Sequence, residues 1–132
     1  MATVLKPLPP QPVARLRLAP RSPFPRPIDG AWWPRSRDLL VELPLLLGAL
    51  PAAWGQIAGI TVNTSMWFSG PGRMLVAGHV VRLHRTEGSH GRHTICLISP
   101  GHGRWDLLVV PPEVDAADAE PLMAAAAAAT AH

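Results

Sequence analysis

Apolar and polar positions alternate in one early stretch of the chain and recur at helical spacing in the next. Residues 13–18 alternate apolar with basic side chains, the period-two pattern of a strand with one wet face. Residues 39–50 place leucines at helical intervals and predict a largely buried helix. Pro44 lacks the N–H for the Leu40 carbonyl, so we expect this helix to kink or restart near Glu42. Ser36 is the predicted N-cap of the helix.

Four further segments have strand character, at residues 57–63, 73–84, 92–98 and 105–110. Short stretches rich in glycine, proline and serine separate them, which favours hairpins and an antiparallel meander. The segment 73–84 is apolar on both faces, so we expect it to be a central strand.

An alanine-rich helix is predicted at residues 115–130, with Pro121 as a candidate for its true first turn. The proline-rich residues 1–12 have no period and are predicted to be disordered. The expected fold is therefore a single α+β domain over residues 13–130. A mostly antiparallel sheet of about five strands is covered by the leucine-rich helix and closed by the C-terminal helix.

Composition limits the class of protein more than it identifies one. A length of 132 residues fits one domain. The pI of about 10.4 accompanies a formal charge of only +3, because one lysine and no tyrosine leave almost nothing to titrate between histidine and arginine. All twelve lysines and arginines lie in residues 1–104, whereas five of the nine acidic side chains lie in residues 105–132. The two ends of the chain are therefore oppositely charged.

Cysteine content and apolar runs bear on the cellular compartment. Cys96 is the single cysteine, so an internal disulfide is excluded, and its apolar strand context predicts a buried small hydrophobe. The prolines in residues 1–12 interrupt any signal-peptide pattern. The longest apolar run, at residues 39–50, is too short to span a bilayer. We therefore expect a cytoplasmic protein that does not enter a membrane.

The densest group of chemically distinctive residues lies between the first strand and the leucine-rich helix. As a candidate binding loop we select Asp29, Trp32, Trp33, Arg35, Ser36, Arg37 and Asp38. Tryptophan and arginine are the residue types enriched at binding hot spots, so the loop could display them to a partner. In the alternative interpretation one tryptophan fills the core, Arg35 pairs with Asp29 or Asp38, and Ser36 simply caps the helix.

The sequence contains no arrangement of residues that is typical of catalysis or metal binding. His90, His93 and Cys96 invite a zinc interpretation, but His93 and Cys96 are three apart in a predicted strand and so face opposite sides. A nucleophile beside a base, a carboxylate pair and a phosphate-binding glycine loop are all lacking. We predict no catalytic residue, no metal and no cofactor, and we keep an enzyme with an unrecognised site as an alternative.

The leading hypothesis is a non-enzymatic binding or regulatory module whose partner is a protein. Binding to RNA or single-stranded nucleic acid is the second alternative, because arginines interleave with aromatic side chains in the N-terminal third. That surface would comprise Arg15, Arg17, Arg21, Phe24, Arg26, Trp32, Trp33, Arg35 and Arg37.

Several strings in the chain resemble a family of short uncharacterised actinobacterial proteins. The strings are DGAWWPRSRDL (29–39), ELP (42–44), MW (66–67), GHVVRL (78–83) and LLVVPP (107–112). High alanine, proline and arginine with scarce lysine is also typical of a GC-rich genome. The resemblance runs from about residue 13 to 125 and implies no assigned activity. It weakens at residues 83–94, where the family has an aromatic residue and this chain has His84, Arg85 and Thr86.

Overall fold

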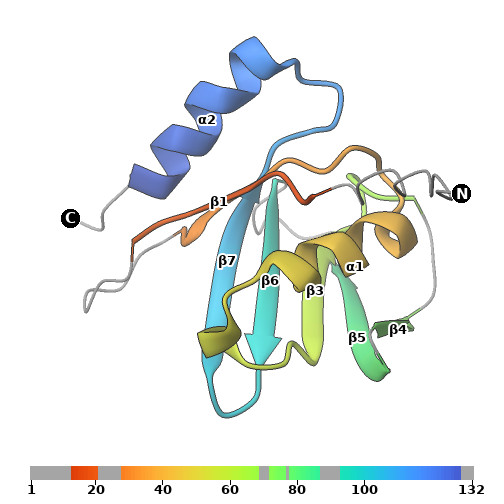
Figure 1. Cartoon of the computed structure of the whole chain (residues 1–132). Coiled ribbons are helices and arrows are strands. Elements are labelled where there is room, and N and C mark those ends of the chain that lie inside the picture. The colour runs from red at the N-terminus through yellow and green to blue at the C-terminus, as the bar shows by residue number, and fades with distance from the viewer. Residues whose placement is uncertain (1–12, 21–27, 69–71, 77, 87–92, 129–132) are drawn as a thin grey trace, which may run out of the picture.

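Two α-helices and seven strands make up the fold of the described part of the chain (Figure 1). The computed structural model describes residues 13–20, 28–68, 72–76, 78–86 and 93–128. The strands are β1 (Leu16–Leu18), β2 (Gly30–Trp32), β3 (Gly59–Asn63), β4 (Arg73–Val76), β5 (His79–Thr86), β6 (Thr94–Ser99) and β7 (Gly103–Val109). The helices are α1 (Leu39–Ala49), the short 3₁₀ helix η1 (Ala52–Trp54) and α2 (Ala116–Ala128).

All seven strands form one sheet in the order β1-β2-β7-β6-β3-β5-β4. Two of its six pairings, β2 with β7 and β3 with β5, are parallel, and the other four are antiparallel. The α+β class is therefore confirmed, whereas the expected sheet of about five mostly antiparallel strands is matched only roughly.

The larger core lies between the sheet and α1. Side chains at alternate strand positions point to this side, as the two-residue period of a strand requires. They meet Leu39, Leu43 and Leu46 of α1. The inward-facing strand residues are Trp32, Ile60, Val62, Val76, Val81, Leu83, Ile95, Leu97, Leu107 and Val109.

A smaller core lies on the other side of the sheet, beneath α2. Ala31 and Trp33 pack there against Ala119 and Met123 of α2 and against Val110. Because α2 packs on β1 and β2, it covers only that end of this side. In the described residues no helix covers the same side of β6, β3, β5 and β4.

The expected central strand at residues 73–84 is wrong, because it is two strands. β4 and β5 form an antiparallel hairpin, with Val76 opposite His79. Gly78 has φ +83°, a left-handed conformation that glycine adopts without strain and that breaks an extended run. Unlike a central strand, β4 lies at the edge of the sheet.

The other predicted strands differ from the observed ones in their bounds, and one observed strand was not predicted. The strand expected at 13–18 spans only Leu16–Leu18, and β3, β6 and β7 begin and end within two residues of their predicted bounds. Residues 30–32 were expected in a loop but form β2, which lies between β1 and β7. The predicted disorder of residues 1–12 lies outside the described residues.

The two prolines of the predicted helices, Pro44 and Pro121, both lie inside a helix. Pro44 is in the middle of α1, which runs on from Leu39 to Ala49 without restarting. Pro44 and Leu40 are both exposed, so water can reach the Leu40 carbonyl that loses its intrahelical donor. Pro121 likewise lies inside α2 rather than in its first turn, since α2 begins at Ala116.

Two glycines provide a matched test of this packing. A Cβ on Gly30 would lie 2.5 Å from the Arg17 carbonyl oxygen, whereas a Cβ on Gly48 would meet nothing within 4 Å. We expect Gly30→Ala to lower the free energy of unfolding by about 1–3 kcal/mol through overpacking. Gly48→Ala should raise it by about 0.5–1 kcal/mol, because alanine favours the helix. Urea denaturation measures both, and equal stabilities would contradict the β1–β2 register.

Candidate functional site

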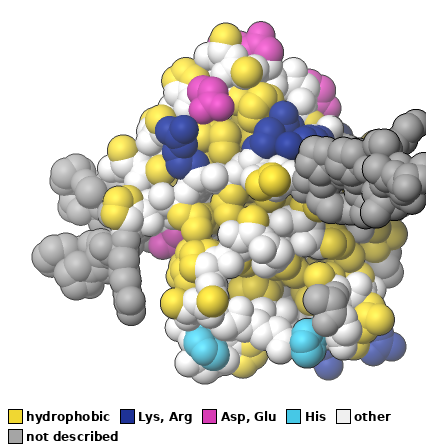
Figure 2. All heavy atoms as spheres, viewed as in Figure 1, with side chains coloured by type: hydrophobic (Ala, Val, Ile, Leu, Met, Phe, Trp, Pro, Cys, Tyr) yellow, Lys and Arg dark blue, Asp and Glu magenta, His cyan; other side chains and the backbone are white. Residues whose placement is uncertain are grey.

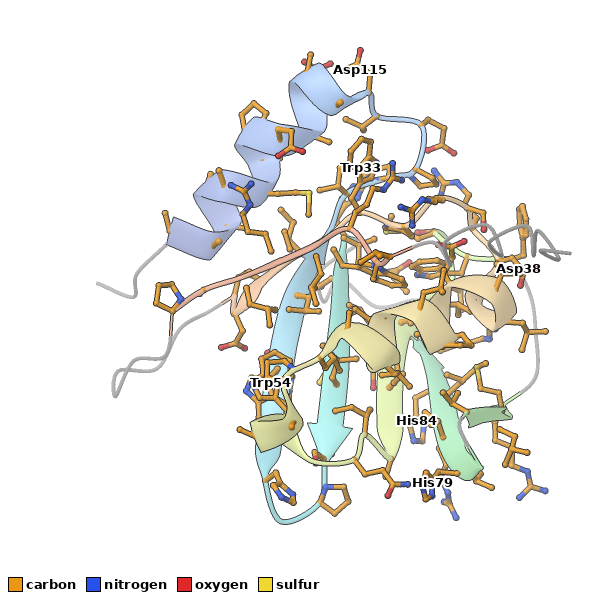
Figure 3. The ribbon with its side chains drawn as sticks, in the orientation of Figure 1. Trp33, Asp38, Trp54, His79, His84 and Asp115 are labelled. Atoms are coloured by element: carbon orange, nitrogen blue, oxygen red, sulfur yellow. The ribbon has the colours of Figure 1, made fainter. Side chains whose placement is uncertain are left out.

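Both tryptophans of the candidate loop are buried, with 1% of Trp32 and 8% of Trp33 exposed. The interpretation in which the loop displays them to a partner is therefore wrong, and the alternative, in which a tryptophan fills the core, holds for both. Trp32 is the last residue of β2 and Trp33 follows it directly, so their side chains point to opposite sides of the sheet, and each side is covered. Trp32 stacks on Trp67 with ring centroids 5.4 Å apart, and Trp33 packs below α2 (Figure 3).

Arg15 contacts both the ring and the backbone of Trp33. Its guanidinium lies 3.6 Å from the centre of the Trp33 ring, a cation–π contact. It also donates to the carbonyls of Trp33 and Pro34, each at 2.9 Å. Burial, and then the nearby Arg35, lower the pKa of Arg15. This arginine therefore stabilises the loop from within the protein.

Glu42 organises the turn that leads into α1, although only 4% of it is exposed. Its Oε1 accepts from the Arg35 backbone N–H at 3.0 Å, and its Oε2 accepts from the Ser36 hydroxyl at 2.9 Å. The predicted Ser36 cap is therefore wrong, because that hydroxyl is committed to Glu42. Asp38 is the N-cap instead and accepts from the Leu40 N–H at 3.0 Å. A lone glutamate in an apolar helix was the signal for this role.

Arg37 joins three segments of the chain. Its guanidinium donates twice to Glu113, each time at 2.8 Å, and once to the Met66 carbonyl at 2.9 Å. Its own carbonyl accepts from the Phe68 N–H at 3.0 Å. The hydrogen bonds with Glu113 raise the pKa of Arg37 and lower that of Glu113.

The two remaining polar residues of the loop also make internal contacts. Arg35 is exposed, and its guanidinium donates to the Val13 carbonyl at 2.7 Å rather than to Asp29 or Asp38. Asp29 accepts from the Asp106 N–H at 2.9 Å and so continues the pairing of β2 with β7. Every member of the predicted loop site therefore contributes to the scaffold.

The structure also uses part of the arginine surface that the nucleic-acid alternative needs. Arg17 pairs with Glu120 at 3.5 Å, and Arg15 and Arg37 make the contacts described above. Trp32 and Trp33 are buried, so their rings are not free to stack on bases. Arg21, Phe24 and Arg26 lie outside the described residues.

An apolar surface adjoins the loop on the outer side of α1. Leu40 is 47% exposed, Val41 55% and Phe68 62%. Phe68 lies next to the loop, because its backbone N–H donates a hydrogen bond to the Arg37 carbonyl. Figure 2 views the side of the molecule that carries α1, and hydrophobic side chains are spread over the described part of this side. This apolar surface was not predicted from the sequence, because a leucine-rich helix is expected to be buried.

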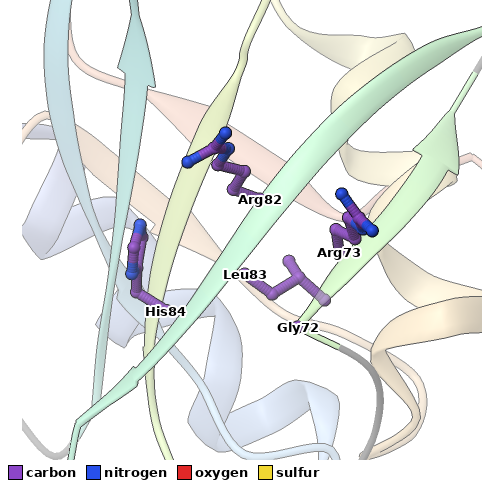
Figure 4. A pocket seen from close by; sticks show the side chains of 5 residues that line it. All are labelled: Gly72, Arg73, Arg82, Leu83 and His84. Carbon is purple, nitrogen blue, oxygen red and sulfur yellow. The ribbon is translucent and has the colours of Figure 1, made fainter.

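A hollow with basic walls lies beside β4 and β5, at the edge of the sheet. Its volume is about 490 Å³, and it is lined by Gly72, Arg73, Arg82, Leu83 and His84. Figure 4 shows Arg82 and His84 extending from β5, with Arg73 on the neighbouring β4.

No metal centre forms within the part of the chain that the structure describes. No group of three histidine, cysteine or acidic side chains is arranged there to hold an ion. Cys96 is buried as expected, whereas His93 is exposed and His90 lies outside the described residues. None of the described helices is long and apolar enough to cross a membrane.

The buried acceptor role of Glu42 predicts a stability change. We expect Glu42→Gln to lower the free energy of unfolding by about 1–3 kcal/mol, because it weakens two hydrogen bonds to a buried carboxylate. The control is Glu120→Gln, which removes an exposed pair and should change stability by less than about 0.5 kcal/mol. Chemical denaturation of both variants measures the difference. Equal stabilities would show that Glu42 does not organise the turn.

The environment of Cys96 predicts low reactivity. Burial, and then the nearby Asp106, raise the pKa of its thiol, so the reactive thiolate is scarce at neutral pH. We expect N-ethylmaleimide to modify Cys96 much more slowly in the folded protein than after unfolding in guanidinium. Mass spectrometry follows the reaction, and equal rates in the two states would contradict this placement.

Comparison with known proteins gives the chain a family. No curated protein and no solved structure matches it. The sequence model of one protein family matches residues 15–126, which include both helices almost entirely and all seven strands. The chain therefore belongs to the family of unknown function DUF5994.

Proposed function

We propose that this chain is a non-enzymatic binding module that contacts a protein through the outer face of α1. One observation carries the proposal. The only charged residue of the helix, Glu42, points inward, while the outward positions are apolar. The exposed positions of α1 are Leu40, Val41, Pro44, Gly48 and Ala49.

Such a helix departs from the usual pattern of a surface helix. A helix at the surface normally turns charged residues to water, and one that is apolar all round is normally buried. In α1 the residues Leu39, Leu43 and Leu46 fill the core, yet the other side has no charge. A protein partner that covered this side would remove exposed apolar area from water.

Phe68 extends the apolar surface, and the candidate loop holds it in place. The Arg37 carbonyl accepts a hydrogen bond from the Phe68 N–H. The Arg37 guanidinium donates to the Met66 carbonyl and forms a salt bridge with Glu113. Because these contacts hold the Phe68 backbone in place, Phe68 would lose less conformational entropy on binding. In this proposal the loop supports the contact surface, and Arg35 is its exposed member at the rim.

We further propose that the partner is a second copy of the chain. The outer face of α1 has no charge with which to select a complementary charged surface. A second, identical uncharged face is therefore a compatible partner. Two copies related by a twofold axis present the same patch to each other. Gly48 has open space around it, so a partner backbone can approach closely there.

A non-enzymatic role also fits the chemistry of the described residues. The raised pKa of Cys96 opposes a nucleophilic role. The basic hollow has no carboxylate in its lining, so it lacks a candidate acid–base pair.

The proposal is tested by placing a carboxylate on the outer face of α1. Val41 is the third residue of α1, where a carboxylate interacts favourably with the helix dipole. We therefore expect Val41→Glu to keep or raise the stability of the monomer and to abolish self-association. Light scattering over a range of protein concentrations measures the molar mass.

Leu122→Glu is the control, because Leu122 is a similarly exposed leucine on α2. We expect this variant to associate like the wild type. A wild-type chain that stays monomeric at its highest soluble concentration would refute self-association, and so would a Val41→Glu variant that still dimerises.

A further inference from the structure

We propose that the basic hollow on the uncovered side of the sheet is a second binding site, which takes a phosphate group between Arg73 and Arg82. The site is independent of the α1 surface. Val81 and Leu83 of β5 point into the α1 core, so Arg82 and His84 point to the opposite side. Arg73 is directly opposite Arg82 in the antiparallel pair and therefore shares that side.

The two guanidiniums form a cross-strand pair of like charges, which is unfavourable unless an anion lies between them. In the described ranges, the arginines that pair with carboxylates are Arg17, Arg37 and Arg104. Arg73 and Arg82 make no such pair there, and both are exposed. Their positive charges are therefore available to an anion from solution.

The lining of the hollow suits a tetrahedral oxyanion. Guanidinium groups bind phosphate through paired N–H donors. His84 lies two residues after Arg82 on the same side of β5 and adds an imidazole to the same hollow. Gly59 is opposite Arg82 on β3 and has no side chain to occupy the space between Arg82 and Ile98. A dianionic phosphate group would match the charge of the two arginines.

The same face argues against a single-stranded nucleic acid as the ligand. Proteins that bind single strands stack bases on aromatic side chains. The described strand residues that point to this side from β3, β4, β5, β6 and β7 include no phenylalanine or tryptophan, and His84 is the one residue there with a ring that could stack. Trp105 of β7 points to the other side, where it stacks on Trp54 with ring centroids 4.3 Å apart. A small phosphate-bearing ligand therefore fits the surface better.

The experiment titrates the full chain with inorganic phosphate and with glycerol phosphate at constant ionic strength, and acetate is the control anion. Calorimetry measures affinity, and thermal unfolding measures stabilisation. We expect phosphate to bind the wild type and to raise its Tm. Binding of glycerol phosphate as well would identify a phosphate monoester as the ligand class, whereas binding of inorganic phosphate alone would identify the free ion.

The variants Arg73→Gln and Arg82→Gln should each weaken phosphate binding about tenfold or more, because a charge-assisted hydrogen-bond donor is lost. Without phosphate, each should unfold at a slightly higher temperature than the wild type, because the like-charge repulsion is relieved. Arg104→Gln is the matched control, since Arg104 points to the same side but pairs with Asp106. This variant should bind phosphate like the wild type.

Four results would overturn the proposal. The first is that phosphate produces neither heat nor a shift in Tm with the wild type. The second is that acetate matches phosphate. The third is that all three variants bind phosphate as the wild type does. The fourth is that a single-stranded RNA oligonucleotide binds while both phosphate compounds fail. Self-association through α1 is measured separately, so neither outcome decides the other.

Discussion

The alternation of side chains along β2 is the constraint on which the rest of the structure depends. Adjacent residues of a strand point to opposite sides, so Trp32 enters the core below α1 and Trp33 enters the core below α2. Both layers are thereby anchored by two consecutive residues at the C-terminal end of β2. The polar residues that follow serve this arrangement, since Arg15 covers Trp33 and Arg37 ties the loop to residues 66 and 113.

The inward position of Glu42 links this scaffold to the surface. A carboxylate inside the protein requires hydrogen-bond donors, and the Arg35 backbone and the Ser36 hydroxyl supply them. The same rotation of α1 turns Leu40 and Val41 towards water. The stability of the loop and the apolar character of the outer surface therefore have one cause, which is the way α1 is docked on the sheet.

The two sides of the sheet differ in chemistry because the helices cover them unequally. On one side, α1 lies over a continuous apolar core. On the other side, α2 covers only the β1–β2 end, and the strands beyond it present Arg73, Arg82, His84 and Arg104. The proposed contact surface on α1 and the basic hollow thus lie on opposite sides of the sheet and use different residues.

The sequence by itself determined the α+β class, the positions of both helices to within two residues and most strands, because periodicity reflects which side chains must leave water. It also identified residues 29–38 as the most distinctive segment. Only the tertiary structure decided what that segment does, because the contacts of Arg37 with Glu113 and of Asp29 with Asp106 join residues more than seventy positions apart. The parallel pairings of β2 with β7 and of β3 with β5 were likewise set by long-range strand register, which local hydrophobic patterns do not encode. Arg73 and Arg82 are cross-strand neighbours because residues 73–84 form a hairpin and not the single predicted strand.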